Sequence, residues 1–181
     1  DGQLAPGSAQ PAHGLWGVYF GFSVACFFAF AWAGMSWEDA FMHMCSTMGL
    51  GGFSSHDASF GYWKSARIEA VAVVFMLLAG INIALYFAAW HHRSARALLA
   101  NVEARAYLAA MALTTAVVSL YIWFNGQYAS YLEALRHTAF HVVSVGTTTG
   151  FASQGYALWP TFAALAMILL AGAAQFLVGV A

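Results

Sequence analysis

The stretch STMGLGGFSS, residues 46–55, decides the fold, because it places glycines and hydroxyl side chains between two apolar segments. Gly49, Gly51 and Gly52 follow Met48 almost at once, and each glycine weakens a helix interior by roughly 1 kcal/mol relative to alanine. Glycine also adopts backbone conformations that most residues avoid. The stretch is therefore predicted to be an irregular loop that can point several backbone carbonyls in one direction.

The sequence around this loop has the composition of a membrane protein. Hydrophobic residues make up 62% of the chain and charged residues 7%, whereas soluble domains carry roughly 25% charged residues. The formal net charge is -1, with Lys+Arg at 6, which leaves no basic surface for nucleic acid. Cys26 and Cys45 have no metal-ligand spacing and are interpreted as packing residues. The chain begins with Asp1 and shows no signal-peptide pattern, so we expect it to be part of a longer one.

Four segments are apolar and long enough to cross a bilayer core of about 30 Å, which takes roughly 20 helical residues. All four are predicted to be helices, because unpaired backbone groups are too costly in lipid. They cover residues 15–33, 68–90, 106–124 and 160–181.

Two shorter helices are predicted between these spans, one in each half of the chain. Ser36 precedes Asp39 by three residues and Ser130 precedes Glu133 by three, which is the capping-box pattern of a helix start. Each helix would cross about half of the bilayer before it reaches glycine and hydroxyl residues. Irregular backbone at that depth is tolerated where it lines a water-filled cavity.

An internal repeat relates the two halves. A shift of 98 residues places Ser46 on Ser144, and the same shift aligns the segments HMCSTMGLGGFSS and HVVSVGTTTGFAS. The repeated unit is a span, a half-length helix, a loop and a second span. The fold class is thus an all-α integral membrane protein with two copies of this unit.

The two loops have the composition of a cation filter. A cation that enters a membrane pore exchanges its water shell for oxygens, and backbone carbonyls supply these without net charge. The carboxyl end of each half-length helix adds about half a negative charge near the pore centre. The threonine hydroxyls of the second loop could offer further oxygens or hold the loop by hydrogen bonds. The predicted ion-binding residues are Thr47, Met48, Gly49, Leu50, Gly51 and Gly52, and Val145, Gly146, Thr147, Thr148, Thr149 and Gly150.

Six neighbouring residues are predicted to support the loops. His43 and His141 align across the repeat and are interpreted as hydrogen-bonding groups behind each loop, and the two aromatic residues as wedges against the spans. The six are His43, Ser46, Phe53, His141, Ser144 and Phe151. His137 and His141 share one helix face, which is also compatible with haem or zinc.

The segments STMGLGGFSSHDASFGYW and VVSVGTTTGFASQGYALWP resemble pore loops of the Trk/Ktr/HKT superfamily of potassium transport subunits, most closely the second and third loops of the bacterial TrkH family. The resemblance implies four pore repeats around one potassium pathway, of which two are present here. It implies filters at 47–52 and 145–150, with Gly52 and Gly150 as filter glycines. It further implies K⁺ as the transported ion, no covalent cofactor, a homodimer and a cytosolic ring of nucleotide-binding regulatory subunits. The family's gate would fall near Gly172 and Gln175.

The function that follows is potassium uptake by a multi-pass protein of the bacterial inner membrane, and not catalysis. The alternatives are a haem-binding electron carrier using His137, His141 or the pair His91 and His92, and a non-conducting structural subunit. Predicted divisions are a polar segment at 1–13, repeats at 14–90 and 106–181, and a basic cytoplasmic connector at 91–105.

Individual polar residues carry further expectations. Asn82 lies inside the second span and is expected to bond a neighbouring helix or to line the pore. Asp57 follows the first loop and could concentrate cations at the pore mouth. Lys64 and Arg67 are expected to pair with Glu69 or Asp57.

Overall fold

The computed structural model describes residues 9–91, 101–155 and 159–179, and every regular element within those ranges is a helix. This confirms the predicted all-α class. The elements in chain order are α1 (Ala9–Ala33), α2 (Trp37–Met48), the 3₁₀ helix η1 (Ser59–Tyr62), α3 (Ala66–Ala79), α4 (Ile83–His91), α6 (Val102–Phe124), α7 (Tyr131–Gly146) and α8 (Thr161–Gly179).

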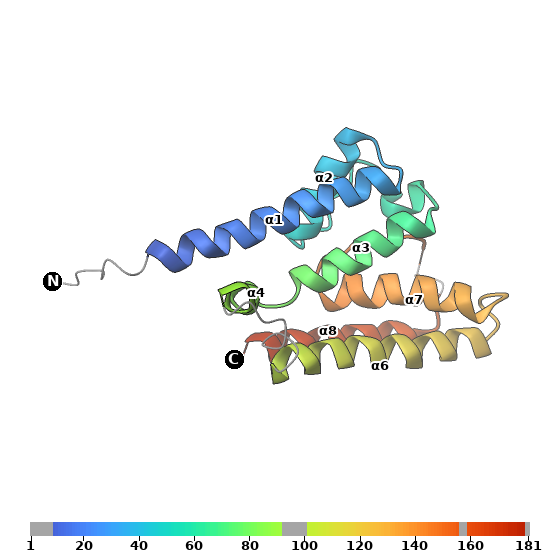
Figure 1. Ribbon diagram of the computed structural model, residues 1–181. Coiled ribbons are helices and arrows are strands. Elements are labelled where there is room, and N and C mark those ends of the chain that lie inside the picture. The colour runs from blue at the N-terminus through green and yellow to red at the C-terminus, as the bar shows by residue number, and fades with distance from the viewer. Residues whose placement is uncertain (1–8, 92–100, 156–158, 180–181) are drawn as a thin grey trace.

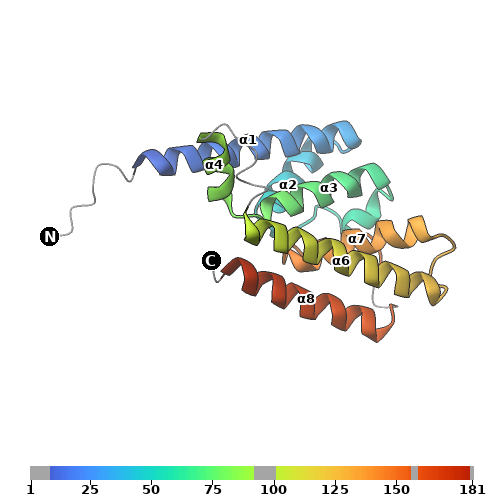
Figure 2. The same ribbon diagram turned by 60° about the horizontal axis from the view of Figure 1, so that its bottom comes forward.

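The chain forms the same sequence of long, short and long helices twice. In Figure 1, α1 and α6 run in the same direction, and the shorter α2 and α7 turn back from their far ends. Within the second unit α6, α7 and α8 pack on one another, and α7 also packs against α3 of the first unit (Figure 2). The two repeats therefore meet through α3 and α7.

Some element boundaries differ from the predicted divisions. Helix α1 begins at Ala9, inside the predicted polar segment, and α6 begins at Val102, inside the predicted connector. The connector residues 92–100, which include His92, Arg93 and Arg96, lie outside the described residues.

Both half-length helices begin at the predicted serines. The Ser36 hydroxyl accepts a hydrogen bond from the backbone N–H of Asp39 at 3.1 Å. The Ser130 hydroxyl accepts one from the N–H of Glu133 at 3.2 Å. Each serine thus satisfies one of the free donors at a helix start, and the acids lie at the positive end of the helix dipole.

The helices suit a membrane, with one difference from the predicted spans. Among the described residues, two helices are long and apolar enough to cross a bilayer, His13–Ala33 within α1 and Val102–Phe124. The predicted span at 68–90 is not one straight helix: α3 and α4 meet at an angle of 83°, and only together could they form a third span. The fourth predicted span is helical from Thr161 to Gly179.

Gly80 and Asn82 account for the break between α3 and α4. A Cβ atom on Gly80 would collide with the Tyr107 hydroxyl of α6, so a larger residue here would require the tyrosine side chain to shift. The Asn82 side-chain oxygen accepts a hydrogen bond from the Ala84 N–H at 3.0 Å and so caps the start of α4. Asn82 is exposed and its bond lies within its own segment, so no bond from its side chain to a neighbouring helix is found among the described residues.

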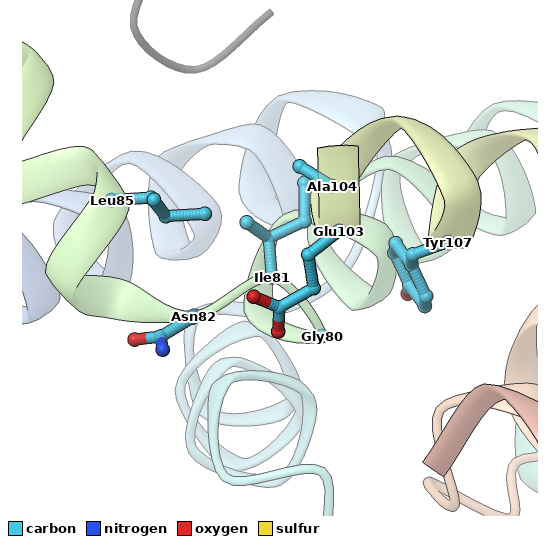
Figure 3. Close-up of a pocket in the computed structure, with 7 residues that line it drawn as sticks. All are labelled: Gly80, Ile81, Asn82, Leu85, Glu103, Ala104 and Tyr107. Atoms are coloured by element: carbon cyan, nitrogen blue, oxygen red, sulfur yellow. The ribbon is translucent and has the colours of Figure 1, made fainter. Parts of the chain in front are cut away.

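A small cavity of about 10 Å³ lies beside the break, between its residues and the first turns of α6 (Figure 3). Such a volume holds about one water molecule. Its lining comprises Gly80, Ile81, Asn82, Leu85, Glu103, Ala104 and Tyr107.

Two apolar cores hold the structure together. The first contains Phe30, Phe60 and Met76 of the first repeat with Phe140 and Phe151 of the second. The second core lies between α6, α7 and α8 and also includes Ile81, from the break between α3 and α4. Because the first core draws on both repeats, packing in it positions the second loop against the first repeat.

Candidate functional site

The two predicted filter loops repeat one backbone geometry. We call residues 47–52 the first loop and residues 145–150 the second loop. Leu50 and its equivalent Thr148 have φ angles of 49° and 60°, and Gly52 and its equivalent Gly150 have φ angles of 69° and 89°. Positive φ is rare outside glycine, so its recurrence at two equivalent positions marks a shared and specific loop shape.

The loops also begin with the same hydrogen bonds. Gly49 N–H donates to Cys45 O at 3.0 Å, and the equivalent Thr147 N–H donates to Val143 O at 2.9 Å. One residue later, Leu50 N–H donates to Thr47 O at 3.2 Å and Thr148 N–H to Val145 O at 3.0 Å. Both half-length helices therefore end in the same turn, after which the chain leaves the helix.

Parts of each loop are open. Gly49, Gly51, Thr148 and Gly150 are exposed, whereas Thr47 is fully buried at 0% exposure. The exposed positions are the ones at which backbone groups could meet an ion.

The threonine hydroxyls of the second loop are engaged within the loop. Thr147 donates to Val143 O at 2.8 Å and lies 2.7 Å from the Thr149 hydroxyl, and Thr148 donates to Thr147 O at 2.6 Å. Thr147 and Thr149 are buried. Of the two roles considered for these hydroxyls, the geometry favours holding the loop.

Each aligned histidine contacts a serine behind its loop. His43 is completely buried, with Nδ1 2.8 Å from Asp39 O and Nε2 2.9 Å from the Ser54 hydroxyl. His141 is also buried, and its Nε2 lies 3.4 Å from the Ser153 hydroxyl. These contacts are the kind of support predicted for the two histidines.

A second pair of contacts holds the same segments, and the sequence interpretation missed it. Ser55 donates to the Asp39 carboxylate at 2.6 Å, and His137 Nδ1 lies 3.3 Å from the Ser153 hydroxyl. The 98-residue shift relates Asp39 to His137 and Ser55 to Ser153. The available signal was a repeat position occupied by two different polar residues, each able to bond a serine.

Several polar groups surround the Asp39 carboxylate in the first turn of α2. Besides Ser55, the Ser36 hydroxyl lies 2.9 Å and His56 Nε2 3.4 Å from its carboxylate. Burial alone would raise the pKa of Asp39, but the hydrogen bonds from Ser55 and Ser36 and the nearby His56 lower it further than burial raises it. The ionised carboxylate is thus the form that holds this segment.

The aromatic residues after the two loops differ. Phe151 is 2% exposed and packs in the first core, and the Ser144 hydroxyl donates to its carbonyl at 2.7 Å. Phe53 is 80% exposed, and the equivalent Ser46 hydroxyl forms no hydrogen bond within the described residues. Phe151 is packed as a wedge would be, whereas Phe53 packs in neither core within the described residues, so its predicted wedge role stays a prediction.

The two loops lie against each other. A Cβ on Gly52 would collide with the backbone carbonyl of Thr149, so the first loop approaches the second at a glycine. Beyond the loops, Gly61 N–H donates to Ala152 O at 3.3 Å, and Ala152 N–H donates to the Ser59 hydroxyl at 3.4 Å. Backbone contacts therefore join the η1 region of one repeat to the segment that follows the filter of the other.

One ion pair also joins the repeats. Arg136 of α7 donates to both carboxylate oxygens of Glu69 of α3, each at 2.8 Å. The predicted pairing of Glu69 with Lys64 or Arg67 is wrong, because Glu69 already faces Arg136 across the helix contact.

The remaining predicted sites are the gate and the histidine site for haem or metal, and neither shows a comparable set of contacts among the described residues. Helix α8 continues unbroken through Gly172 and Gln175, whose surroundings lie outside the described residues. His137 and His141 both contact Ser153. Within the described part of the chain no group of three metal-ligating side chains comes together.

Comparisons with known proteins match nearly the whole chain. The family model for TrkH, a cation transport protein, matches residues 8–174. The Trk system potassium uptake protein TrkH of Halomonas elongata is 38% identical over 160 residues, which cover 88% of this chain and 33% of that protein. The TrkH protein of Salmonella typhimurium is 37% identical over 173 residues, covering 96% and 35%.

The fold agrees with these matches. The crystal structure of the potassium transporter TrkH from Vibrio parahaemolyticus superposes with a TM-score of 0.87 at 35% identity, over 94% of this chain and 37% of that one. The present chain thus spans about one third of the length of these relatives. It belongs to the TrkH family of cation transport proteins, and its described residues include helices long and apolar enough to cross a membrane.

Proposed function

We propose that this chain forms half of a potassium uptake pathway, in which the first and second loops supply two walls of a carbonyl selectivity filter. Potassium uptake is the activity in the names of the relatives. The ligands at the filter are the backbone oxygens of the two loops, and K⁺ is the transported ion. In this proposal K⁺ is bound in the filter without a charged side chain among its ligands.

The observation that carries the proposal is the repeated backbone of the two loops. Leu50 and Thr148, followed by Gly52 and Gly150, take positive φ after the same helix-ending turn. A sequence of such conformations turns successive carbonyls towards one side, as a row of ion sites requires. A surface loop has no physical reason to reproduce this order at the end of a second capped half-length helix.

Electrostatics supports the same reading. Helices α2 and α7 end at Met48 and Gly146, one and two residues before the exposed Gly49 and Thr148. Their carboxyl ends carry about half a negative charge each, which favours a cation at the loops. Glu38, Asp39 and Glu133 lie in the first turns, at the opposite ends of these helices.

The proposed assembly rests on the presence of two repeats in this chain and on the family resemblance. Two repeats offer two walls, and the enclosure of an ion needs further walls from the rest of the polypeptide. The proposed quaternary structure is a homodimer that binds a cytosolic ring of nucleotide-binding subunits, and it rests on the family resemblance alone. Gly172 and Gln175 stay proposed gate residues on the same ground.

The test measures rubidium and sodium uptake by the complete polypeptide, in cells that lack their own potassium uptake. Gly52→Ser introduces strain at positive φ and a collision with the Thr149 carbonyl, and Gly150→Ser introduces strain at φ 89°. Each variant is expected to lower the ratio of rubidium to sodium uptake by roughly tenfold, or to abolish flux.

Gly126→Ser is the matched control, because Gly126 also has positive φ, at 71°, with open space around it, but lies in the turn after α6. It should keep the wild-type ratio. Wild-type ratios in both loop variants at matched expression would exclude the filter assignment and favour a non-conducting structural role.

A further inference from the structure

Glu69 and Arg136 form a partly buried, bidentate contact between the two repeats, in which the carboxylate is buried and the guanidinium side chain is 34% exposed. Glu69 lies in the first turn of α3 and is only 3% exposed, and Arg136 reaches it from α7 with two hydrogen bonds of 2.8 Å. The residues are 67 positions apart in the chain. The pairing of a guanidinium fork with both oxygens of a carboxylate fixes distance and orientation together.

The repeat itself does not require this pair. The 98-residue shift relates Arg136 to Glu38 and Glu69 to Met167. Glu38 is exposed, and Met167 is a buried apolar residue of the second core. A span, half-length helix and loop thus fold with neither a guanidinium at the first of these positions nor a carboxylate at the second, so the pair belongs to the contact between these two repeats.

The pair lies on the elements that carry the two loops. Arg136 is next to His137, which contacts Ser153 behind the second loop. Glu69 lies in the first turn of α3, the helix that follows η1, and η1 bonds the backbone of Ala152 through Gly61 and Ser59. A change in the spacing of α3 and α7 would therefore move one loop relative to the other, where Gly52 already touches the Thr149 carbonyl.

Removing a carboxylate from water is costly, and a buried ion pair often adds little net stability compared with apolar residues of similar size. What such a pair does supply is a fixed geometry. We propose that Glu69 and Arg136 are positioning residues that set the spacing of the two filter loops and thereby the selectivity of the pore. This inference rests on the proposed function of the loops.

The decisive variant is the double substitution Glu69→Met and Arg136→Met, which replaces the pair by apolar side chains of similar length and leaves no unpaired charge. Its amount in the membrane and its melting temperature in detergent report folding. The ratio of rubidium to sodium uptake by the complete polypeptide reports positioning. We expect folded protein with a ratio lowered by roughly tenfold.

Two further variants sharpen the test. Arg136→Lys keeps the charge but not the fork, and it should lower the ratio by a smaller factor. Arg67→Met removes an exposed cation from the same helix as Glu69 and should leave the ratio unchanged. If the double variant does not accumulate, the result for Arg136→Lys decides: a wild-type ratio overturns the proposal.

A folded double variant with the wild-type ratio would also overturn the proposal and leave the pair a purely structural contact. The glycine variants separate this failure from that of the filter itself. If Gly52→Ser and Gly150→Ser lower the ratio while the double variant does not, the positioning role alone is wrong. If none of them changes the ratio, the filter assignment is wrong as well.

Discussion

Asp39 holds the segment after the first loop through a single carboxylate. It accepts hydrogen bonds from Ser55 and Ser36 and lies close to His56. At the equivalent position of the other repeat, His137 contacts Ser153. An acidic and a basic residue thus make equivalent contacts, because each can form a hydrogen bond with a serine hydroxyl.

The pH dependence of this contact follows from the lowered pKa of Asp39. A carboxylate whose pKa is lower in the folded state than its ordinary value of about 3.9 stabilises the fold at all higher pH values. That contribution is lost as the pH falls through the lowered pKa. Because Asp39 is only half-buried, solvent screening limits the effect to about 1 kcal/mol.

We therefore expect Asp39→Asn to melt below wild type in detergent from about pH 8 to about pH 5, and the difference to close below about pH 4. Thermal unfolding followed by circular dichroism measures it. Glu38→Gln, an exposed acid beside it, is the control and should match wild type throughout. A gap that persists unchanged at low pH would show that the ionised carboxylate is not the stabilising form.

Among the elements, the second span shows how a helix can end within an apolar run. The segment from Ala66 to His91 is apolar almost throughout, yet it divides at Gly80 and Asn82 into α3 and α4. The signal was present as a glycine followed by an asparagine, a helix stop beside a helix cap. Hydropathy did not reveal the break, because it depends on the composition of a segment and not on the direction of the helix axis.

The break makes Gly80 sensitive to any added side-chain atom. Gly80→Ala brings a methyl group into collision with the Tyr107 hydroxyl and is expected to cost about 1 to 3 kcal/mol of stability. Combining it with Tyr107→Phe removes the colliding oxygen and should recover part of that loss. Thermal unfolding in detergent measures both.

The control for this substitution is Gly17→Ala in α1, where an added Cβ meets nothing within 4 Å. Alanine should be neutral or stabilise the helix there by up to about 1 kcal/mol. Equal melting temperatures for Gly80→Ala and wild type would mean that α3 and α6 separate easily, and that the break does not depend on glycine.

At the scale of the whole molecule, the described residues of the two repeats are joined through apolar packing in both cores, the ion pair of Glu69 and Arg136, and the backbone of the post-filter segments. Phe151 lies in the first core with Phe30 and Phe60 of the first repeat, whereas the equivalent Phe53 is exposed. The repeats are thus alike in backbone and different in what surrounds them. In a chain that spans about one third of its relatives, the exposed face at Phe53 has no partner among the described residues.

This difference gives a matched pair of variants. Phe151→Ala should destabilise the fold by about 3 to 5 kcal/mol, because it leaves a cavity at the contact of the repeats. Phe53→Ala in the present chain should change stability by less than about 0.5 kcal/mol. Unfolding in detergent compares them, and equal losses would contradict the burial of Phe151 in a core shared by both repeats.

Much of the local structure was predictable because it depends on short-range chemistry. The serine caps of α2 and α7 follow from a side chain and a backbone donor three residues apart. The loops follow from glycine and from the repeat, and the membrane location from composition. The partner of Glu69 was predicted wrongly, since it lies on a helix that is distant in the sequence. The surroundings of Asn82 and Phe53 also depend on more than the local pattern, and both side chains are exposed among the described residues.

The sequence by itself thus determined the membrane environment, the repeated unit and the positions of the two loops, because hydropathy, capping and glycine act over a few residues. The tertiary structure alone decided that α3 and α4 diverge, that Glu69 meets Arg136, and that the two loops touch at Gly52 and Thr149. Those features arise from the packing of helices far apart in the chain, and no local pattern encodes which side chain a packed helix will face.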